Sequence, residues 1–334
     1  MCMCSQKNVN LTASEIASIW QSYMSLTHCS CILKYSISIA EDMEVRNTLT
    51  KTLENMEHQT QKTKHLLEVE KIPVPVGFGI QDIDMNAPRL FSDSFSLLYF
   101  KNVARMMTSS YSLMYTMSSR KDIMDHFRVG TGEIMHVFEL ISNVLLDKGI
   151  YNRAPIIDSS KKVDFIENKD YVSGNNLFGD QRFLNAVEIS HVFGNLEANV
   201  VGNTITKAFG QTADKKEVRE FMEQAGNLSE KIISSLTKVL TSSQLPAPMP
   251  SETQIYSSTQ PPFSDKFVMY QMSILTSAGV SDYATSVATS LRNDLKRFYS
   301  DVLQDTVKLG KKAETLMIKN SWLEQPPQQE KVEF

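Results

Sequence analysis

The first pattern with chemical potential is a Glu-x-x-His pair, Glu133 and His136, in a helical stretch of the chain. In a four-helix bundle such a pair binds two metal ions when a second Glu-x-x-His and two inward glutamates complete the ligand set. The remaining ligands are missing. Residues 71–132 contain no glutamate, and the C-terminal half has a single histidine, His191. We therefore expect Glu133 and His136 to be a solvated pair on a helix face, and we expect no metal and no cofactor.

The four cysteines form two C-x-C pairs, Cys2 with Cys4 and Cys29 with Cys31. Two thiolate pairs can hold a metal ion, but the usual spacing is C-x2-C. Cys29 and Cys31 lie in a helical stretch, where residues i and i+2 point in very different directions. We predict small buried thiols at Cys29 and Cys31, and an oxidisable pair at the N-terminus.

Patterns typical of other enzyme classes are missing as well. The sequence has no G-x-S-x-G nucleophile elbow, and neither Gly77-x-Gly79 nor Gly130-x-Gly132 follows a predicted strand, as a phosphate-binding loop would. His28 and Cys29 are adjacent on a helix, where neighbouring side chains point apart. We therefore predict that the protein is not an enzyme.

The stretch from Arg105 to Met117 is unusual because methionine, tyrosine and small hydroxyl residues replace the usual leucine and isoleucine. One interpretation is an adaptable small-molecule pocket lined by Met106, Tyr111, Met114 and Tyr115. The other is close helix packing through small residues, with methionine filling gaps, and we favour this second interpretation.

Length and charge restrict the classes of protein that remain. A chain of 334 residues is long for one core and comfortable for two. The net charge of −4, with both signs mixed, predicts no binding to nucleic acid. No run approaches 18 consecutive apolar residues and no signal peptide is recognisable, so we expect cytoplasmic synthesis and no membrane span.

A duplication supplies the elements that position these side chains. Glu44-Val45-Arg46 recurs as Glu217-Val218-Arg219, displaced by 173 positions. Phe91-Ser92-Asp93 recurs as Phe263-Ser264-Asp265, displaced by 172, and Arg120-x-Asp122 recurs at the same offset as Arg292-x-Asp294. A near-constant offset over this span predicts a duplicated domain. We call the matching residue in the other repeat the counterpart.

Each repeat reads as four long helices. Thr12-x-x-Glu15 and Asn185-x-x-Glu188 are capping boxes at the start of the first helices. The second helix covers about 43–70, and its counterpart about 214–242 has apolar residues at steps of three and four. The third helices begin at Ser92 or Asp93 and at Ser264 or Asp265. No convincing period-two alternation of a strand is present.

The connection between the second and third helices is long and rich in proline, over residues 71–91 and 244–263. A segment of that length can run the full height of a bundle, so the second and third helices can be parallel, as in ferritin-like bundles. The sequence thus predicts an all-α protein of two tandem ferritin-like four-helix bundles. The predicted boundaries are 1–151 for repeat 1, 152–183 for a linker, 184–322 for repeat 2 and 323–334 for a polar tail.

Arg89 is the candidate interaction residue. It lies in Asn86-Ala-Pro-Arg-Leu-Phe-Ser-Asp93, where Pro88 restricts the loop and Ser92 or Asp93 caps the next helix. We expect Arg89 to reach either the capping carboxylate or a partner.

Several segments carry a family resemblance. They are Leu11-Thr-Ala-Ser-Glu-Ile16, Ile72-Pro-Val-Pro-Val-Gly-Phe78, Met117-Ser-Ser-Arg-Lys-Asp122 and Pro262-Phe-Ser-Asp-Lys266. Over nearly its whole length the chain resembles an uncharacterised two-repeat, spore-coat-protein-like family of spore-forming bacteria. The resemblance implies a ferritin-like fold related to coat protein F, and it implies no catalytic residue.

These observations together predict a non-catalytic structural or interaction protein of sporulating bacteria, associated with the spore coat. Its partners would be proteins or further copies of the chain. The alternative is a small-molecule-binding module that uses the methionine and tyrosine residues of the third helix.

Overall fold

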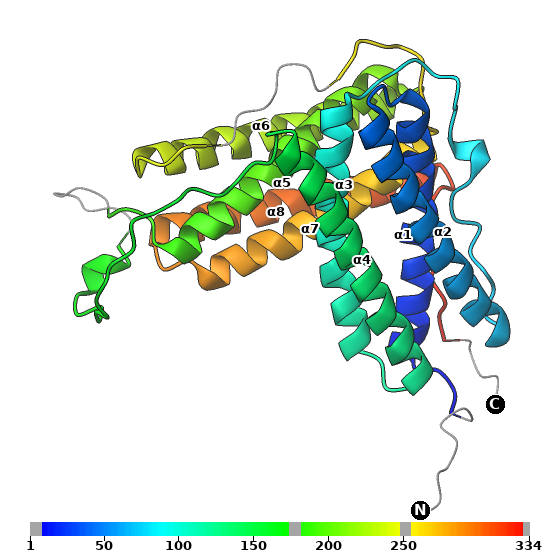
Figure 1. Ribbon diagram of the computed structural model, residues 1–334, viewed down its shortest axis with the longest axis horizontal. Helices are drawn as coiled ribbons and strands as arrows, with labels where there is room; N and C mark the ends of the chain where they lie inside the picture. The colour runs from blue at the N-terminus through cyan, green and yellow to red at the C-terminus, as the bar shows by residue number, and fades with distance from the viewer. Residues whose placement is uncertain (1–8, 174–181, 248–254, 330–334) are drawn as a thin grey trace, which may run out of the picture. The chain divides into compact units, whose positions relative to one another are not determined.

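The computed structural model describes residues 9–173, 182–247 and 255–329. In these ranges the chain forms eight α-helices and no β-strand, which confirms the predicted all-α class (Figure 1). Chain contacts divide the molecule into two compact units, and each unit corresponds largely to one repeat. Cys2 and Cys4 lie outside the described residues.

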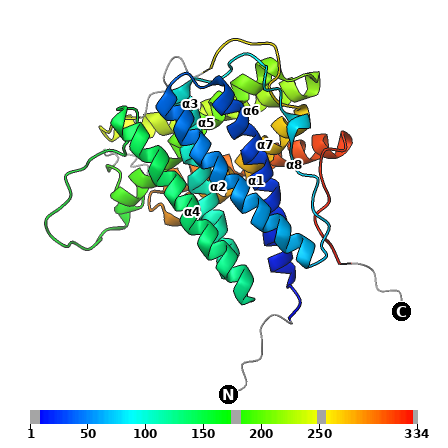
Figure 2. The same cartoon turned by 45° about the vertical axis from the view of Figure 1, so that its right-hand side comes forward.

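Unit 1 consists, among the described residues, of 9–151, 260–267 and 321–329. Its helices run side by side in Figures 1 and 2. They are α1 (Ala13–Ile39), α2 (Met43–Val69), α3 (Asp93–Thr116) and α4 (Lys121–Asp147). A short 3-10 helix, Ile80–Asp82, interrupts the long connection between α2 and α3.

Two ion pairs show the direction of the helices in unit 1. Arg120 at the start of α4 contacts Glu70 after the end of α2 at 2.6 Å, and Lys148 after α4 contacts Asp42 before α2 at 2.7 Å. Helices α2 and α4 are therefore antiparallel. Because a short turn makes α3 and α4 antiparallel too, α2 and α3 run parallel, as the long connection predicts. Ferritin-like bundles share this topology, and the wider likeness to them stays a prediction.

Two distant segments complete unit 1. Phe263 forms an antiparallel bridge with Ile83, and Phe267 stacks on the buried ring of His28, with 3.9 Å between ring centroids. In the C-terminal segment, the Glu324 carboxylate accepts the N–H groups of Val76 (2.9 Å) and Gly77 (2.8 Å). Residues from the far end of the sequence thus belong to the first unit.

Unit 2 contains α5 (Ala186–Thr212), α6 (Lys216–Ser242), α7 (Asp265–Thr289) and α8 (Asn293–Lys319). The first three residues of α7 group with unit 1. Lys319, the last residue of α8, pairs with Glu217 in the first turn of α6, so these two helices are also antiparallel.

The duplication extends to backbone detail. Lys71 and its counterpart Gln244 both adopt positive φ, 57° and 58°, just after α2 and α6. The residue that follows each of them donates its N–H to a carbonyl of the last helical turn, Ile72 to Leu67 and Leu245 to Leu240. This is the Schellman pattern that ends helices. The two repeats therefore use the same helix stops as well as the same helices.

By length and composition alone, α4 is the one helix among the described residues that is apolar enough to cross a membrane, with a mean hydropathy of 1.2. Its side chains Ile123, Phe127 and Ile134 are fully buried inside unit 1. A core helix of a bundle meets the same criterion.

Candidate functional site

The most elaborate polar arrangement in unit 1 surrounds Glu15 in the first turn of α1. Its side chain is fully buried, and Oε1 accepts the N–H groups of Ser119 (2.8 Å) and Arg120 (2.7 Å). Oε2 accepts the N–H of Thr12 at 2.8 Å, which completes the predicted capping box. Burial raises the pKa of Glu15, but these backbone donors outweigh it and hold the pKa at about 2.

Arg120 extends this arrangement to the end of the bundle. Its guanidinium donates to Asp122 (2.8 Å), to Glu70 (2.6 Å) and to the carbonyl of Val9 (3.2 Å). These carboxylates raise the pKa of the guanidinium. We call Glu15, Ser119, Arg120 and Asp122 the end clamp, because they join the start of α1 to the turn between α3 and α4.

Unit 2 repeats the end clamp atom for atom at its core. Glu188 Oε1 accepts the N–H groups of Leu291 (3.1 Å) and Arg292 (3.0 Å), and Arg292 donates to Asp294 and to the carbonyl of Arg182. The side chain of Arg182 adds an ion pair to Glu188 at 2.8 Å. Backbone groups and arginines contact these carboxylates, so each end clamp joins the first helix of its unit to the turn before the last helix.

Arg89 contacts its own neighbourhood. Its guanidinium donates to Asp93 at 2.7 Å and to the carbonyl of Phe91 at 3.1 Å, and it also pairs with Glu41. Asp93 in turn accepts the N–H of Asp42 at 2.7 Å. Arg89 thus binds the carboxylate of Asp93, next to the helix cap Ser92. Through Asp93 it links the loop before α3 to the turn before α2.

Glu133 and His136 do not assemble a ligand set. Glu133 pairs with Lys62 at 3.5 Å across the α2–α4 contact, while His136 lies on the exposed face of α4. Within the described ranges, no group of three or more His, Cys, Asp or Glu side chains is placed to hold a metal ion.

The four pocket candidates of α3 separate into two kinds. Tyr111 is buried, and its hydroxyl hydrogen-bonds to Ser22 at 2.6 Å. Burial raises its pKa. Met106, Met114 and Tyr115 are half-buried, and the cavities described below are lined by other residues.

The two cysteines among the described residues, Cys29 and Cys31, lie in surroundings that suppress thiol reactivity. Burial raises the pKa of both Cys29 and Cys31 to about 12, so their nucleophilic thiolate forms are suppressed at neutral pH. Burial also lowers the pKa of the adjacent His28 to about 3, so its imidazole is neutral. Neither thiol has the activated environment that cysteine catalysis requires.

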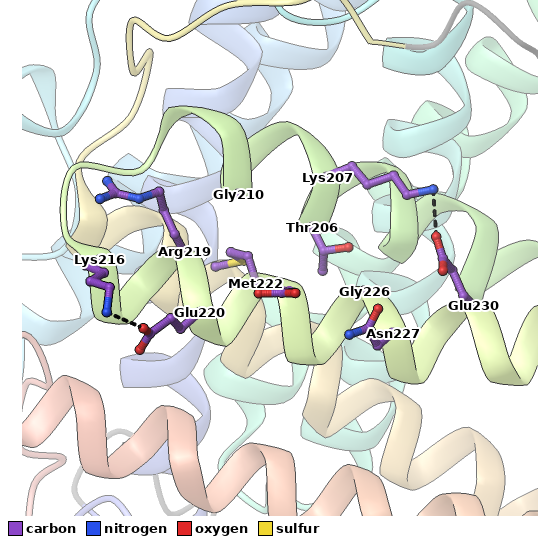
Figure 3. A pocket seen from close by; sticks show the side chains of 11 residues that line it. Thr206, Lys207, Gly210, Lys216, Arg219, Glu220, Met222, Gly226, Asn227 and Glu230 are labelled. Carbon is purple, nitrogen blue, oxygen red and sulfur yellow. Dashed lines mark ion pairs between the residues drawn. The ribbon is translucent and has the colours of Figure 1, made fainter.

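Unit 2 has a groove of about 580 Å³ between α5 and α6 (Figure 3). It forms where Gly210 and Gly226 replace Ile37 and Leu53 of repeat 1. Its charged side chains are largely paired with each other, as in Lys207 with Glu230 at 2.8 Å. Figure 3 shows this pair at one end of the groove and Lys216 with Glu220 at the other. Such exposed pairs contribute little binding energy of their own.

Unit 1 has a pocket of about 520 Å³ at the equivalent pair of helices. It lies between α1, α2 and the segment 78–83, and we call it the unit 1 pocket. Lys34 and Glu57 form an ion pair at 2.9 Å in its lining, and they are the counterparts of Lys207 and Glu230. No local sequence pattern indicates this pocket, because its third wall comes from the long connection between α2 and α3. Its lining is Thr27, Ser30, Cys31, Lys34, Glu57, His58, Thr60, Gln61, Phe78, Gly79, Ile80 and Ile83.

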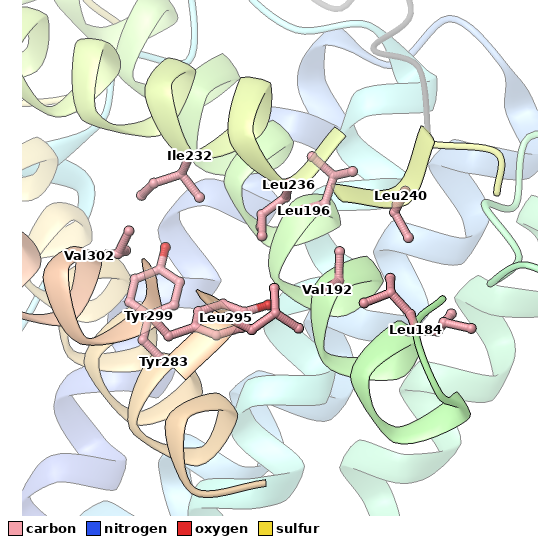
Figure 4. Close-up of a cluster of buried hydrophobic side chains, with 11 residues drawn as sticks. Leu184, Val192, Leu196, Ile232, Leu236, Leu240, Tyr283, Leu295, Tyr299 and Val302 are labelled. Atoms are coloured by element: carbon pink, nitrogen blue, oxygen red, sulfur yellow. The ribbon is translucent and has the colours of Figure 1, made fainter. Parts of the chain in front are cut away.

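The interiors of the two units differ in polarity. In unit 2 the buried cluster drawn in Figure 4 includes Ile232 and Leu236 of α6 and Val302 of α8. In unit 1 the counterparts of the two α6 residues are Gln59 and Thr63, both fully buried. Thr63 contacts the ring of His126 at 3.3 Å, whereas both amide atoms of Gln59 lack a hydrogen-bond partner among the described groups.

The fold and the clamps define a duplicated, all-helical protein with one clamp in each unit. A family model matches residues 1–163 and 172–333, and the chain belongs to that family, which is described as "Protein of unknown function (DUF3231)". No curated protein matches the chain. A crystal structure described as a "putative spore coat protein" from Bacillus halodurans is similar at 17% identity and a TM-score of 0.43. The match covers 45% of this chain and 98% of that protein.

Proposed function

We propose that the protein is a non-catalytic structural and interaction protein of spore-forming bacteria, and that it acts in the spore coat. The observation that carries the interaction role is the extended segment of residues 153–167, which we call the linker segment. Three large apolar side chains in it are almost completely exposed: Ile156 (91%), Val163 (91%) and Phe165 (81%). Exposed apolar residues gathered in this way are typical of binding surfaces.

The chain is ordered on both sides of the linker segment. Before it, the N–H of Tyr151 donates to the carbonyl of Leu145 at the end of α4. After it, a 3-10 helix, Lys169–Tyr171, leads to Val172, whose carbonyl accepts the N–H of Asn293 at 3.0 Å. The linker segment is thus anchored to unit 1 at one end and to unit 2 at the other, and an anchored segment loses less conformational entropy on binding than a free tail would.

The non-catalytic part of the proposal is supported by the buried titratable groups. Glu15 has its pKa held at about 2, His28 at about 3, and Cys29 at about 12. General acids and bases work best with pKa values near the operating pH. The sporulation setting is supported by the sequence resemblance to the spore-coat-protein-like family.

The test combines association and localisation. Ile156→Ser, Val163→Ser and Phe165→Ser together should lower the average mass of the purified full chain in sedimentation equilibrium, and should remove a fluorescent fusion from the coat of sporulating cells. Ile318→Ser, at a residue of α8 that is 65% exposed, is the matched control and should change neither. An association state and coat location unaffected by the triple variant would refute the proposal.

A further inference from the structure

We propose that the unit 1 pocket binds a small amphipathic carboxylate, with the carboxylate held by Ser30 and Lys34 and the apolar body held by the segment 78–83. This proposal goes beyond the structural role and does not depend on it. It also places the ligand away from the methionine and tyrosine residues of α3.

The first observation is the hydroxyl of Ser30. The residue is 7% exposed, it lines the pocket, and its oxygen has no hydrogen-bond partner among the described groups. Thr27, one turn earlier on the same face of α1, instead donates to the carbonyls of Tyr23 and Met24 at 3.0 Å each. A buried hydroxyl without a partner is costly, so a ligand atom that accepts its hydrogen is favoured.

Lys34 supplies the charge. It lies four residues after Ser30, so the two side chains are neighbours on one face of α1. An ammonium group has three N–H donors, and the ion pair with Glu57 uses only part of that capacity. The side chain is 43% exposed, so a ligand can approach it from solvent. A carboxylate placed between Ser30 and Lys34 can accept from both.

The wall formed by the segment 78–83 is apolar, whereas α2 contributes the polar residues Glu57, His58, Thr60 and Gln61. Phe78 and Ile83 are 6% and 9% exposed, and the uncharged thiol of Cys31 lies beside them and contacts the carbonyl of Gly79 at 3.6 Å. A volume of about 520 Å³ with one apolar wall opposite polar side chains suits an amphipathic small molecule.

This wall is fixed before any ligand arrives. Asp82 accepts the hydroxyl of Ser264 at 2.8 Å and the N–H of Gly79 at 3.2 Å. The N–H of Phe78 lies 3.4 Å from the hydroxyl of Thr27. Such a preorganised wall reduces the entropy lost on binding.

Unit 2 provides an internal control. It keeps the ion pair as Lys207 and Glu230, but the counterpart of Ser30 is Asn203, whose amide already donates to the carbonyl of Gly226 at 3.0 Å. The buried side chain that lacks a partner in unit 1, Ser30, therefore corresponds in unit 2 to a side chain that already has one within the protein.

The experiment titrates the full chain with octanoate by isothermal calorimetry and uses 1-octanol as the uncharged probe of equal chain length. We expect one octanoate site, with octanol about 10-fold weaker. Ser30→Ala and Lys34→Met should each weaken octanoate about 10-fold or more, because each removes a hydrogen bond to the charged carboxylate. Lys207→Met is the matched control and should leave octanoate affinity unchanged.

Three outcomes would overturn the proposal. Equal affinity for octanol and octanoate would exclude a carboxylate site, and equal losses in Lys34→Met and Lys207→Met would show unspecific charge attraction. Glu57→Gln removes a negative charge next to the proposed carboxylate site and should strengthen octanoate binding about 2-fold or more. Because a variant that only lost its fold could not bind more tightly, this change separates loss of folding from loss of binding. Weaker binding in that variant would also count against the proposal. Unchanged circular dichroism establishes that each variant is folded.

Discussion

The end clamps of units 1 and 2 are nearly identical, whereas the helices between them pack in two different ways. Glu15 and Glu188 each accept the same pair of backbone N–H groups in the turn before the last helix of the unit. Halfway along the bundle, however, unit 1 buries Gln59 where unit 2 buries Ile232.

This difference shows which contacts define the fold. The end clamp specifies which helix ends meet, because its charged hydrogen bonds are directional and expensive to leave unmade. The buried positions in the middle of the bundle have instead diverged, with Gln59 in unit 1 and Ile232 in unit 2. A duplicated bundle can therefore change its interior while its ends keep the helices in register.

The largest effect is expected at the end clamps. Glu15→Ala removes the acceptor of three N–H groups, those of Thr12, Ser119 and the buried Arg120, and we expect the free energy of unfolding of unit 1 to fall by about 3–4 kcal/mol. Both tryptophans, Trp20 and Trp322, belong to unit 1, so their fluorescence during urea unfolding reports that unit alone.

Glu188→Ala should weaken unit 2 to a similar degree, visible in circular dichroism and not in tryptophan fluorescence. Glu68→Ala, which removes only an exposed ion pair with Lys64, is the control and should cost less than about 1 kcal/mol. If the Glu15 variant lost no more than this control, the end clamp would not be a determinant of stability.

The second effect depends on pH. Burial lowers the pKa of His126 to about 4, from an ordinary value of 6.5. Between these two values the unfolded chain binds the proton and the folded chain does not, so stability falls as pH drops from 6.5 towards 4. At these values the loss for this residue is about 3 kcal/mol.

The counterpart of His126 is Phe298, which supplies the test. His126→Phe should flatten the fluorescence-detected stability profile of unit 1 between pH 6.5 and 4. The remaining slope should reflect His28, whose pKa is also lowered, to about 3, so that its protonation in the unfolded chain likewise reduces stability as pH drops. Glu15 adds to the slope mainly below its ordinary pKa of 4.5, because its stabilisation is lost as pH falls from 4.5 towards 2. An unchanged slope in the variant would contradict the assignment.

The third effect is an exchange of interior residues. Gln59→Ile, which installs the counterpart, should stabilise unit 1 by about 1–2 kcal/mol because it removes two unpartnered buried amide atoms. The reverse change, Ile232→Gln, should destabilise unit 2 by about 2 kcal/mol or more. Should Gln59→Ile prove destabilising in urea unfolding, the amide must make a bond that stabilises the bundle.

The smallest effect concerns two glycines of α4. A Cβ atom at Gly130 would lie 2.8 Å from the ring of Tyr111, so Gly130→Ala should cost about 1–2 kcal/mol in thermal unfolding. Nothing lies within 4 Å of a Cβ at Gly132. Gly132→Ala should therefore be neutral or stabilise by up to about 1 kcal/mol through helix propensity. Equal effects at both positions would show that Tyr111 can move aside.

The helices were predictable because each repeat has its own apolar periodicity and its own capping residues, so the two repeats gave two independent indications of every helix. The capping boxes at Thr12 and Asn185 are present as predicted, and the second helix, predicted over about 43–70, spans Met43–Val69. The parallel course of α2 and α3 followed from the length of the proline-rich connection. These are local signals, set by neighbours a few residues apart.

The sites were less predictable because they depend on contacts far apart in the sequence. Phe267 stacks on His28 and Ser264 binds Asp82, yet no local pattern indicates that residues 260–267 pack in unit 1. The wall of the unit 1 pocket comes from residues 78–83, in the long connection between α2 and α3, so its lining could not be listed in advance. The polar stripe of Gln59 and Thr63 was readable by comparing counterparts, since their partners are Ile232 and Leu236.

The bond from Glu324 to the backbone of Val76 and Gly77 has a consequence for synthesis. A ribosome produces the four helices of unit 1 long before it reaches Glu324. The bundle can collapse early, but the segment 76–83 receives its contact with Glu324 only after that residue has been made and has left the ribosome. We expect nascent chains stalled before residue 320 to be cut by protease within 76–83, and released chains to resist, with Glu324→Ala behaving like the stalled form.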